Sequence, residues 1–127
     1  TKVLNGEAVD VTMGSFNLIW QGDACARAIQ CWQHVASPPK FLNVTGAEKV
    51  SIRHVAEEFG RLLGKDPVIT GEEAESAWLA DASESMRLFG PVTTSLETIM
   101  KMVADHLQGG GKLLGKPTHF ESRDGKF

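Results

Sequence analysis

The sequence predicts a small α/β domain in which a sheet of short strands packs with three to four helices. Three observations point to this class. Strand-like and helix-like segments alternate along the chain, the composition is 42% hydrophobic and 23% charged, and the length is 127 residues. Such a composition is usual for globular domains, and the length fits one domain with its own core.

The first half of the chain is predicted to form a strand, a helix and a second strand. Aromatic and β-branched residues predict the first strand at Phe16–Trp20, and Asp23 is placed to cap the helix behind it. This helix ends before Ser37-Pro38-Pro39. Its apolar stripe, which we expect to pack in the core, consists of Cys25, Ala28, Ile29, Trp32 and Val35. A short buried strand is expected at Phe41–Val44, before the turn at Thr45-Gly46.

The clearest helix in the sequence follows Ser51, whose hydroxyl suits an N-cap. Charged residues at i,i+3 and i,i+4 spacing occupy one side, and Gly64 is placed as a left-handed C-cap. The other side carries apolar residues at the helical period, namely Ile52, Val55, Ala56, Phe59, Leu62 and Leu63. A third strand is expected at Pro67–Thr70.

Two capping-box spacings predict the last two helices. Asp81 with Glu84 predicts a short helix that runs to about Phe89. Thr94 with Glu97 predicts a longer helix, which the triplet Gly109–Gly111 ends. We therefore divide the chain into a folded domain over residues 1–108 and a Gly-rich link with a polar tail over residues 109–127.

Several classes of partner are excluded by charge and composition. The net charge of −3 does not fit a nucleic-acid-binding protein, which usually carries a basic patch. No apolar run approaches the roughly 20 residues that span a bilayer. Cys25 and Cys31 would point about 120° apart on a helix, so neither a disulfide nor a zinc site is expected. We expect both cysteines to be buried in a protein of the reducing cytoplasm.

No complete catalytic, cofactor-binding or metal-binding set can be recognised from the residues. The four histidines, His34, His54, His106 and His119, lie in separate segments without metal-site spacing. The GxxxxGK spacing at Gly110–Lys116 lacks the Ser or Thr that a phosphate loop needs next. The acidic run Glu72–Glu75 is typical of a solvated loop, although such a run can also hold a cation.

Four residues are candidates for contact with a substrate. Trp20 and Gln21 directly follow a predicted strand, at the kind of strand-to-helix turn where α/β sheets bind ligands. His119 and Arg123 lie in the polar tail, whose many hydrogen-bonding side chains favour docking onto a surface or a partner. A disordered terminus accounts for the tail equally well.

The order of these segments resembles the C-terminal portion of an extended short-chain dehydrogenase/reductase, the NAD-dependent epimerase/dehydratase family. The resemblance covers about residues 9–108. It is carried by three blocks, which are Phe16–Ala24; Phe41–Gly46 with Val50–Ile52 and Leu63–Lys65; and Ala77–Ser83 with Leu88–Gly90. The resemblance implies the substrate-binding portion of an enzyme whose NAD(P) is held by an N-terminal Rossmann domain.

Two departures from the family limit what the chain can do. The family transfers protons with a Tyr-x-x-x-Lys pair and binds its cofactor through a glycine fingerprint. This chain has no tyrosine and no such fingerprint, so we expect it to be inactive in isolation. UDP-sugar epimerases of this class anchor the diphosphate with arginines, where this chain has Phe16 and the acidic segment Gly71–Ala74. We therefore expect a small polar or sugar-like substrate without a nucleotide.

Two functions remain open at this point. The chain is either the substrate-binding part of an NAD-dependent epimerase, dehydratase or reductase, or a stand-alone non-catalytic module for ligand binding or dimerisation. Its first residue is Thr1 rather than Met, which fits an excised or processed piece. In the family the strand matching Phe41–Val44 joins the sheet of the whole enzyme, so we expect an open strand edge here. With apolar helix faces such as Ile52, Val55 and Phe59 partly uncovered, this edge predicts a symmetric homodimer.

Overall fold

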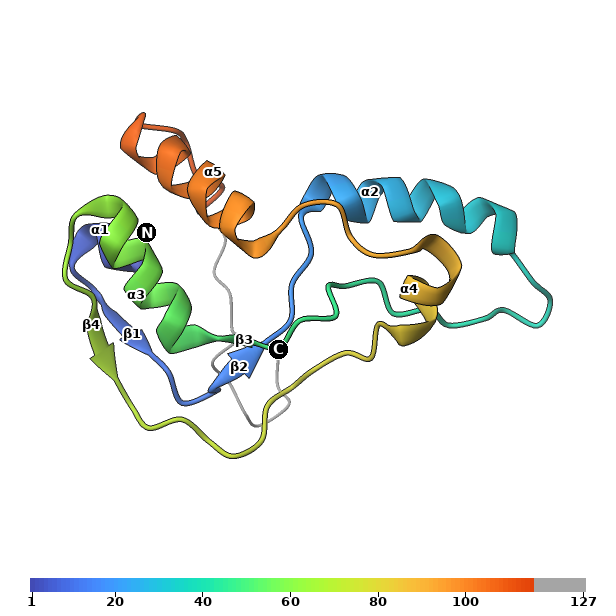
Figure 1. The fold of residues 1–127 in the computed structure, drawn as a ribbon, viewed down its shortest axis with the longest axis horizontal. Coiled ribbons are helices and arrows are strands. Elements are labelled where there is room, and N and C mark those ends of the chain that lie inside the picture. The colour runs from blue at the N-terminus through green and yellow to red at the C-terminus, as the bar shows by residue number, and fades with distance from the viewer. Residues whose placement is uncertain (116–127) are drawn as a thin grey trace.

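The computed structural model describes residues 1–115 and confirms the predicted α/β class (Figure 1). Short strands and helices alternate over these 115 residues, which contain five α-helices where three to four were expected. The elements are α1 (Lys2–Asn5), β1 (Ala8–Asp10), β2 (Ser15–Phe16), α2 (Gln21–Gln30), the 3₁₀ helix η1 (Cys31–His34), β3 (Val50–Ser51), α3 (Ile52–Leu63), β4 (Val68–Thr70), α4 (Ser83–Phe89) and α5 (Leu96–Gln108).

The strands form two separate two-stranded sheets. β1 pairs with β4 in parallel, with Val9 opposite Ile69. β2 pairs with β3 in antiparallel register, with Phe16 opposite Val50. The strand expected at Pro67–Thr70 is therefore confirmed as β4, whereas its partner β1 was not predicted.

Helix α3 is the centre of the packed lobe and has the predicted ends. The Ser51 hydroxyl accepts a hydrogen bond from the His54 amide at 3.3 Å, and Gly64 adopts the left-handed conformation with φ 64°. α3 packs against α1 and α5, and these three helices share a core of Val3, Ala56, Leu63 and Ala104. A second buried cluster, Val11, Met13 and Ile52, lies beneath the N-terminal end of α3.

The segment around α2 differs from the prediction. Only Ser15 and Phe16 form a strand, so the strand expected at Phe16–Trp20 is mostly wrong. α2 begins at Gln21 with Trp20 as its N-cap residue, two positions before Asp23. Since Asp23 lies inside the first turn, its carboxylate is directed to another segment, where it accepts hydrogen bonds from Thr93 and Thr94.

The apolar stripe of α2 and the strand expected after it are not buried. Ile29, Trp32 and Val35 are exposed, with Trp32 80% accessible. The burial expected for the two cysteines is also wrong, since Cys25 is exposed and Cys31 is only partly buried. Phe41–Val44 forms no strand, and Phe41 is 93% accessible. A strand needs a partner edge and a buried stripe needs a facing surface. Within residues 1–115, α2 packs closely with η1 alone among the helices and strands.

Helices α4 and α5 lie where they were predicted, although their caps differ. Ala82 is the N-cap residue of α4 and makes no side-chain cap bond, and the Asp81 carboxylate just before it accepts a hydrogen bond from the Ser83 amide at 2.9 Å. Glu84 does not close the expected box, because it pairs with Lys40 and Arg87. α5 is capped by Ser95 rather than Thr94, one residue later than predicted.

Two further expectations concern the ends and surface of the chain. The predicted contact residues His119 and Arg123 lie outside the described residues. Among residues 1–115, no helix combines the length and the apolar character that crossing a lipid bilayer requires.

Candidate ligand-binding site

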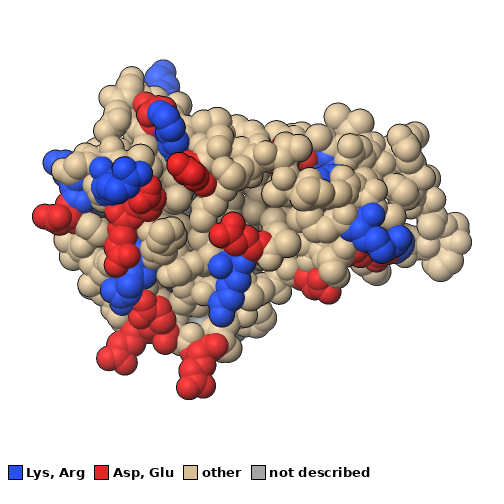
Figure 2. All heavy atoms as spheres, viewed as in Figure 1, with Lys and Arg blue, Asp and Glu red and all other residues tan. Residues whose placement is uncertain are grey.

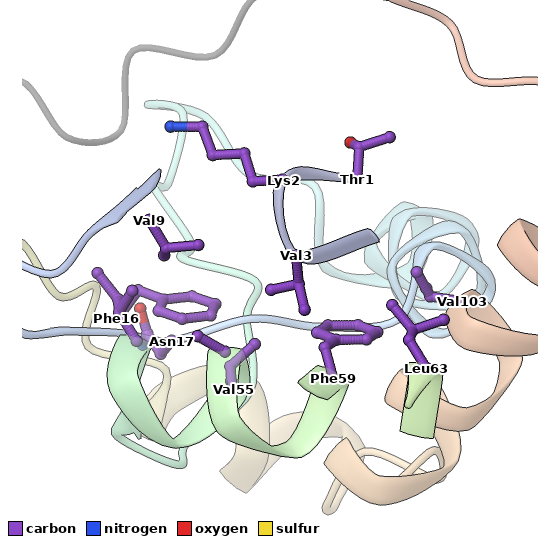
Figure 3. A pocket seen from close by; sticks show the side chains of 12 residues that line it. Thr1, Lys2, Val3, Val9, Phe16, Asn17, Val55, Phe59, Leu63 and Val103 are labelled. Atoms are coloured by element: carbon purple, nitrogen blue, oxygen red, sulfur yellow. The ribbon is translucent and has the colours of Figure 1, made fainter. Parts of the chain in front are cut away.

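An apolar recess of about 590 Å³ lies between α1, the β1–β2 segment, α3 and α5 (Figure 3). This volume is within the range of small-molecule sites, about 300–1,000 Å³. Val9 and Phe16 form one side, Val55 and Phe59 form the opposite side, and Val103 of α5 closes one end. We refer to it below as the recess.

The helical period of α3 produces one wall of the recess. Residues three and four apart lie on one helix face, so Ile52, Val55, Ala56, Phe59 and Leu63 all line it. Ile52, Ala56 and Leu63 are buried against the core. Val55 and Phe59 are only partly buried, so a ligand could remove further apolar surface of these two side chains from water.

Asn17 at the edge of the recess joins three segments of the chain. Its amide nitrogen donates to the carbonyl of Ala80 at 2.7 Å and to that of Gly46 at 3.2 Å. Its amide oxygen accepts from the Ala80 backbone at 3.3 Å. Gly46 in turn donates to the Leu18 carbonyl at 3.0 Å. Asn17 therefore fixes the edge of the recess against two loops that are distant in sequence.

Sequence reasoning did not single out Asn17. Its partners lie 29 and 63 residues away, and no local pattern shows such distances. The available signal was an amide side chain within an otherwise apolar predicted strand, where a polar group needs a hydrogen-bonding partner.

Lys2 is the sole cationic side chain among the residues that line the recess. The Asp10 carboxylate lies close enough to Lys2 to be influenced by it. Hydrogen bonds from the side chain and the backbone of Thr12, with a smaller contribution from Lys2, hold the pKa of Asp10 below its usual value. Asp10 itself does not line the recess.

Arg53 follows the recess residue Ile52 directly but is engaged elsewhere. Its guanidinium donates two hydrogen bonds to the Glu73 carboxylate. This pairing lowers the pKa of Glu73 and raises that of Arg53. The acidic run Glu72–Glu75 thus supplies one partner of an ion pair. Figure 2 shows further positive and negative side chains on the part of the molecule that contains α3.

The two described contact candidates lie at the strand-to-helix turn, outside the recess lining. Trp20 is 36% accessible, and its indole nitrogen lies 2.8 Å from the point where a Cβ on Gly22 would be. Gln21 is the exposed first residue of α2. Both lie a few residues beyond Asn17, on the segment that leaves the recess.

Comparison with known proteins shows similarity of structure without detectable similarity of sequence family. No protein-family model matches the chain, and no curated protein matches it. Among solved structures, RMD from Pseudomonas aeruginosa complexed with NADPH matches 86% of this chain with a TM-score of 0.68 at 12% identity. The chain has the fold of one part of an extended short-chain dehydrogenase/reductase. The predicted resemblance is therefore confirmed for the fold.

Two epimerases give similar results. UDP-glucuronic acid 4-epimerase from Bacillus cereus in complex with NAD matches 87% of this chain with a TM-score of 0.64 and 17% identity. UDP-glucose 4-epimerase from Thermus thermophilus, also with NAD, matches 85% with a TM-score of 0.63 and 16% identity. The matched region spans 39%, 38% and 38% of these three chains. This chain therefore corresponds to less than two fifths of the length of each of these proteins.

Proposed function

We propose that this chain is the substrate-binding portion of an NAD(P)-dependent enzyme of the epimerase and reductase kind. The observation that carries the proposal is the structural match, which covers 86% of this chain but 39% of an NADPH-complexed protein. The recess supplies a concave surface of suitable size for part of a small substrate. The substrate would be a small hydroxyl or carbonyl compound, sugar-like at its reacting end.

The cofactor and the proton-transfer groups are assigned to the rest of the enzyme. The chain has no tyrosine and no glycine fingerprint, so its residues do not fit the role of holding NAD(P) or of donating a phenolic proton. NAD(P) would supply hydride transfer when bound to the rest of the enzyme. This chain would orient the substrate and exclude water on its own side.

The face of α2 and η1 is where we expect the rest of the enzyme to pack. Ile29, Trp32, Val35 and Phe41 are among the most exposed apolar side chains of the described residues. No Asp, Glu, Lys or Arg occurs between Ala28 and Pro39. A surface this apolar is typical of a protein interface, and the matched proteins are more than twice as long as the region they share with this chain. The free thiols of Cys25 and Cys31 support a cytoplasmic location.

The test is made on the product of the complete reading frame that encodes these residues. We expect that product to bind NADH or NADPH, measured by the change in nicotinamide fluorescence, while the 127-residue chain alone gives no change. A complete product that binds neither cofactor would contradict the proposal. Turnover of a sugar with NAD by the 127-residue chain alone would contradict it as well.

A second function, a stand-alone module that binds a ligand or forms a homodimer, is favoured by one observation. The uncharged face of α2 and η1 could pair with the same face of a second copy, as symmetric dimers do. A start codon directly before Thr1 would favour this function. An upstream GxxGxxG after a predicted strand, followed by Tyr-x-x-x-Lys, would favour the enzyme.

A further inference from the structure

We infer that the recess takes an uncharged, apolar ring of the substrate and does not accept the diphosphate of a nucleotide sugar. The inference rests on the proposed function for the reaction, and it specifies the chemical class of the substrate. It sets this chain apart from the matched proteins that are named for nucleotide sugars, UDP-glucose 4-epimerase and UDP-glucuronic acid 4-epimerase among them.

The lining of the recess is the first step of the argument. A diphosphate carries negative charge and requires cations, usually arginines that bind its oxygens in pairs. The recess is walled mainly by valine, isoleucine, leucine and phenylalanine side chains, and Lys2 is the sole lining residue with a cationic side chain. Placing a diphosphate against such walls would desolvate its charge without adequate compensation.

The second step concerns the arginines. Every arginine within residues 1–115 is already bound to other groups. Arg53, Arg61 and Arg87 pair with glutamates, and Arg27 donates to the backbone carbonyls of the segment 89–91. A diphosphate would therefore have to displace an existing partner before any of these four guanidinium groups could bind it.

The shape of the recess is the third step. Figure 3 shows the rings of Phe16 and Phe59 at different points along the recess, with Val3 and Val55 between them. A recess lined by aromatic and branched aliphatic side chains favours a flat or ring-shaped apolar group, which can pack against such surfaces. The substrate therefore carries an aryl or alicyclic ring that occupies the recess, while its hydroxyl or carbonyl end, the reacting end of the proposed function, is directed out of the recess.

Binding of a neutral fluorescent probe to the 127-residue chain tests this inference. N-phenyl-1-naphthylamine should brighten on binding, and 4-phenyl-2-butanone should displace it, whereas UDP-glucose should not. Val55→Arg places a cation in the recess and should weaken probe binding by about tenfold or more. Ile29→Arg is the matched control on the α2 face and should bind the probe as wild type does.

A second measurement uses the wild-type chain, so that the inference can still be tested if Val55→Arg does not fold. Adding 4-phenyl-2-butanone to the wild-type chain should shift the amide NMR signals of Val55, Phe59 and Val103. Probe binding that Ile29→Arg abolishes, or shifts confined to α2, would overturn the inference.

The outcomes for the complete enzyme separate this inference from the proposed function. Cofactor binding with turnover of UDP-glucose would leave the proposed function standing and overturn the apolar substrate. Binding of 4-phenyl-2-butanone in the recess of a complete product that binds neither cofactor would support the apolar site and refute the proposed function.

Discussion

Asp23 on α2 accepts a hydrogen bond from the backbone amide of Thr94 at 3.0 Å, and a second from the hydroxyl of Thr93. Asp23, in the first turn of α2, is thereby hydrogen-bonded to the residues just before α5, about 70 positions later in the sequence. The bond from the Thr93 hydroxyl is the main reason why the pKa of Asp23 lies below its ordinary value of 3.8.

This relationship predicts a pH dependence of stability. A carboxylate whose pKa is lower in the folded chain contributes stability that is complete above its unfolded value, and that is lost as the pH falls through the folded value. For Asp23 the loss therefore begins near pH 3.8 and continues below it. We expect Asp23→Asn to lower the melting temperature by a few degrees at about pH 6 and by less at about pH 3. Thermal unfolding followed by circular dichroism measures both values.

The matched control for this prediction is Asp66→Asn in the exposed turn after α3. Its melting temperature should follow wild type at both pH values. A deficit of Asp23→Asn that stays constant, or grows on acidification, would refute the role of the Asp23 carboxylate.

Arg27 makes a second link between α2 and the same segment. It is buried, and its guanidinium donates to the carbonyls of Phe89, Gly90 and Pro91. Arg27→Met retains much of the apolar stem but leaves these carbonyls without their donor, so we expect a loss of about 2–3 kcal/mol in the free energy of unfolding. Urea denaturation provides the value. Arg87→Met, on an exposed side chain, should change stability little, and an equal effect of the two variants would argue against the link.

Gly46 lies against the backbone of Leu18, in the segment after β2, and the space between them leaves no room for a side chain. A Cβ at this position would lie 2.2 Å from the Leu18 carbonyl oxygen, which is a backbone atom. Gly46→Ala must therefore displace the backbone and disturb the bonds of Asn17, and we expect a loss of more than about 2 kcal/mol. Gly64→Ala is the comparison, since space is open there and only the positive φ is unfavourable. Its cost should be about 1 kcal/mol, so equal costs in urea denaturation would contradict the prediction.

The exposed face of α2 and η1 predicts self-association of the chain when it is purified alone. An uncovered apolar surface of this kind gains by contact with another apolar surface. We expect dimers or larger species at about 100 μM by light scattering, where weak association becomes visible. Trp32→Glu should restore the monomer without loss of stability, because Trp32 is already exposed. Leu114→Glu, at an exposed site in another part of the chain, should associate as wild type does.

The elements that were predicted correctly are those whose signals are local. Helix α3 combines a capping serine, a regular apolar period and a terminal glycine, so the sequence alone determines both of its ends. The caps of α5 show the limit of such signals. Thr94 and Ser95 are both capable caps, and the bond from the Thr94 amide to Asp23 favours Ser95 as the residue that begins the helix.

The features that were missed depend on distant or external partners. β1 has three residues, too few for a pattern, and its place follows from pairing with β4 some 60 positions later. The strand expected at Phe41–Val44 and the burial expected for Trp32 both require a facing surface. Residues 1–115 provide none against Phe41 or Trp32, which are exposed. The recess likewise arises from the meeting of α1, α3 and α5, which no local pattern reveals.

The attachment of α2 has a mechanical consequence. Its tethers to the segment before α5 are the hydrogen bonds of Asp23 and Arg27, which reach residues 89–94. A protein docked on α2 would therefore be connected to the segment before α5 through these two side chains, as well as to β2 through the backbone. That segment leads into α5, the helix whose Val103 lines the recess.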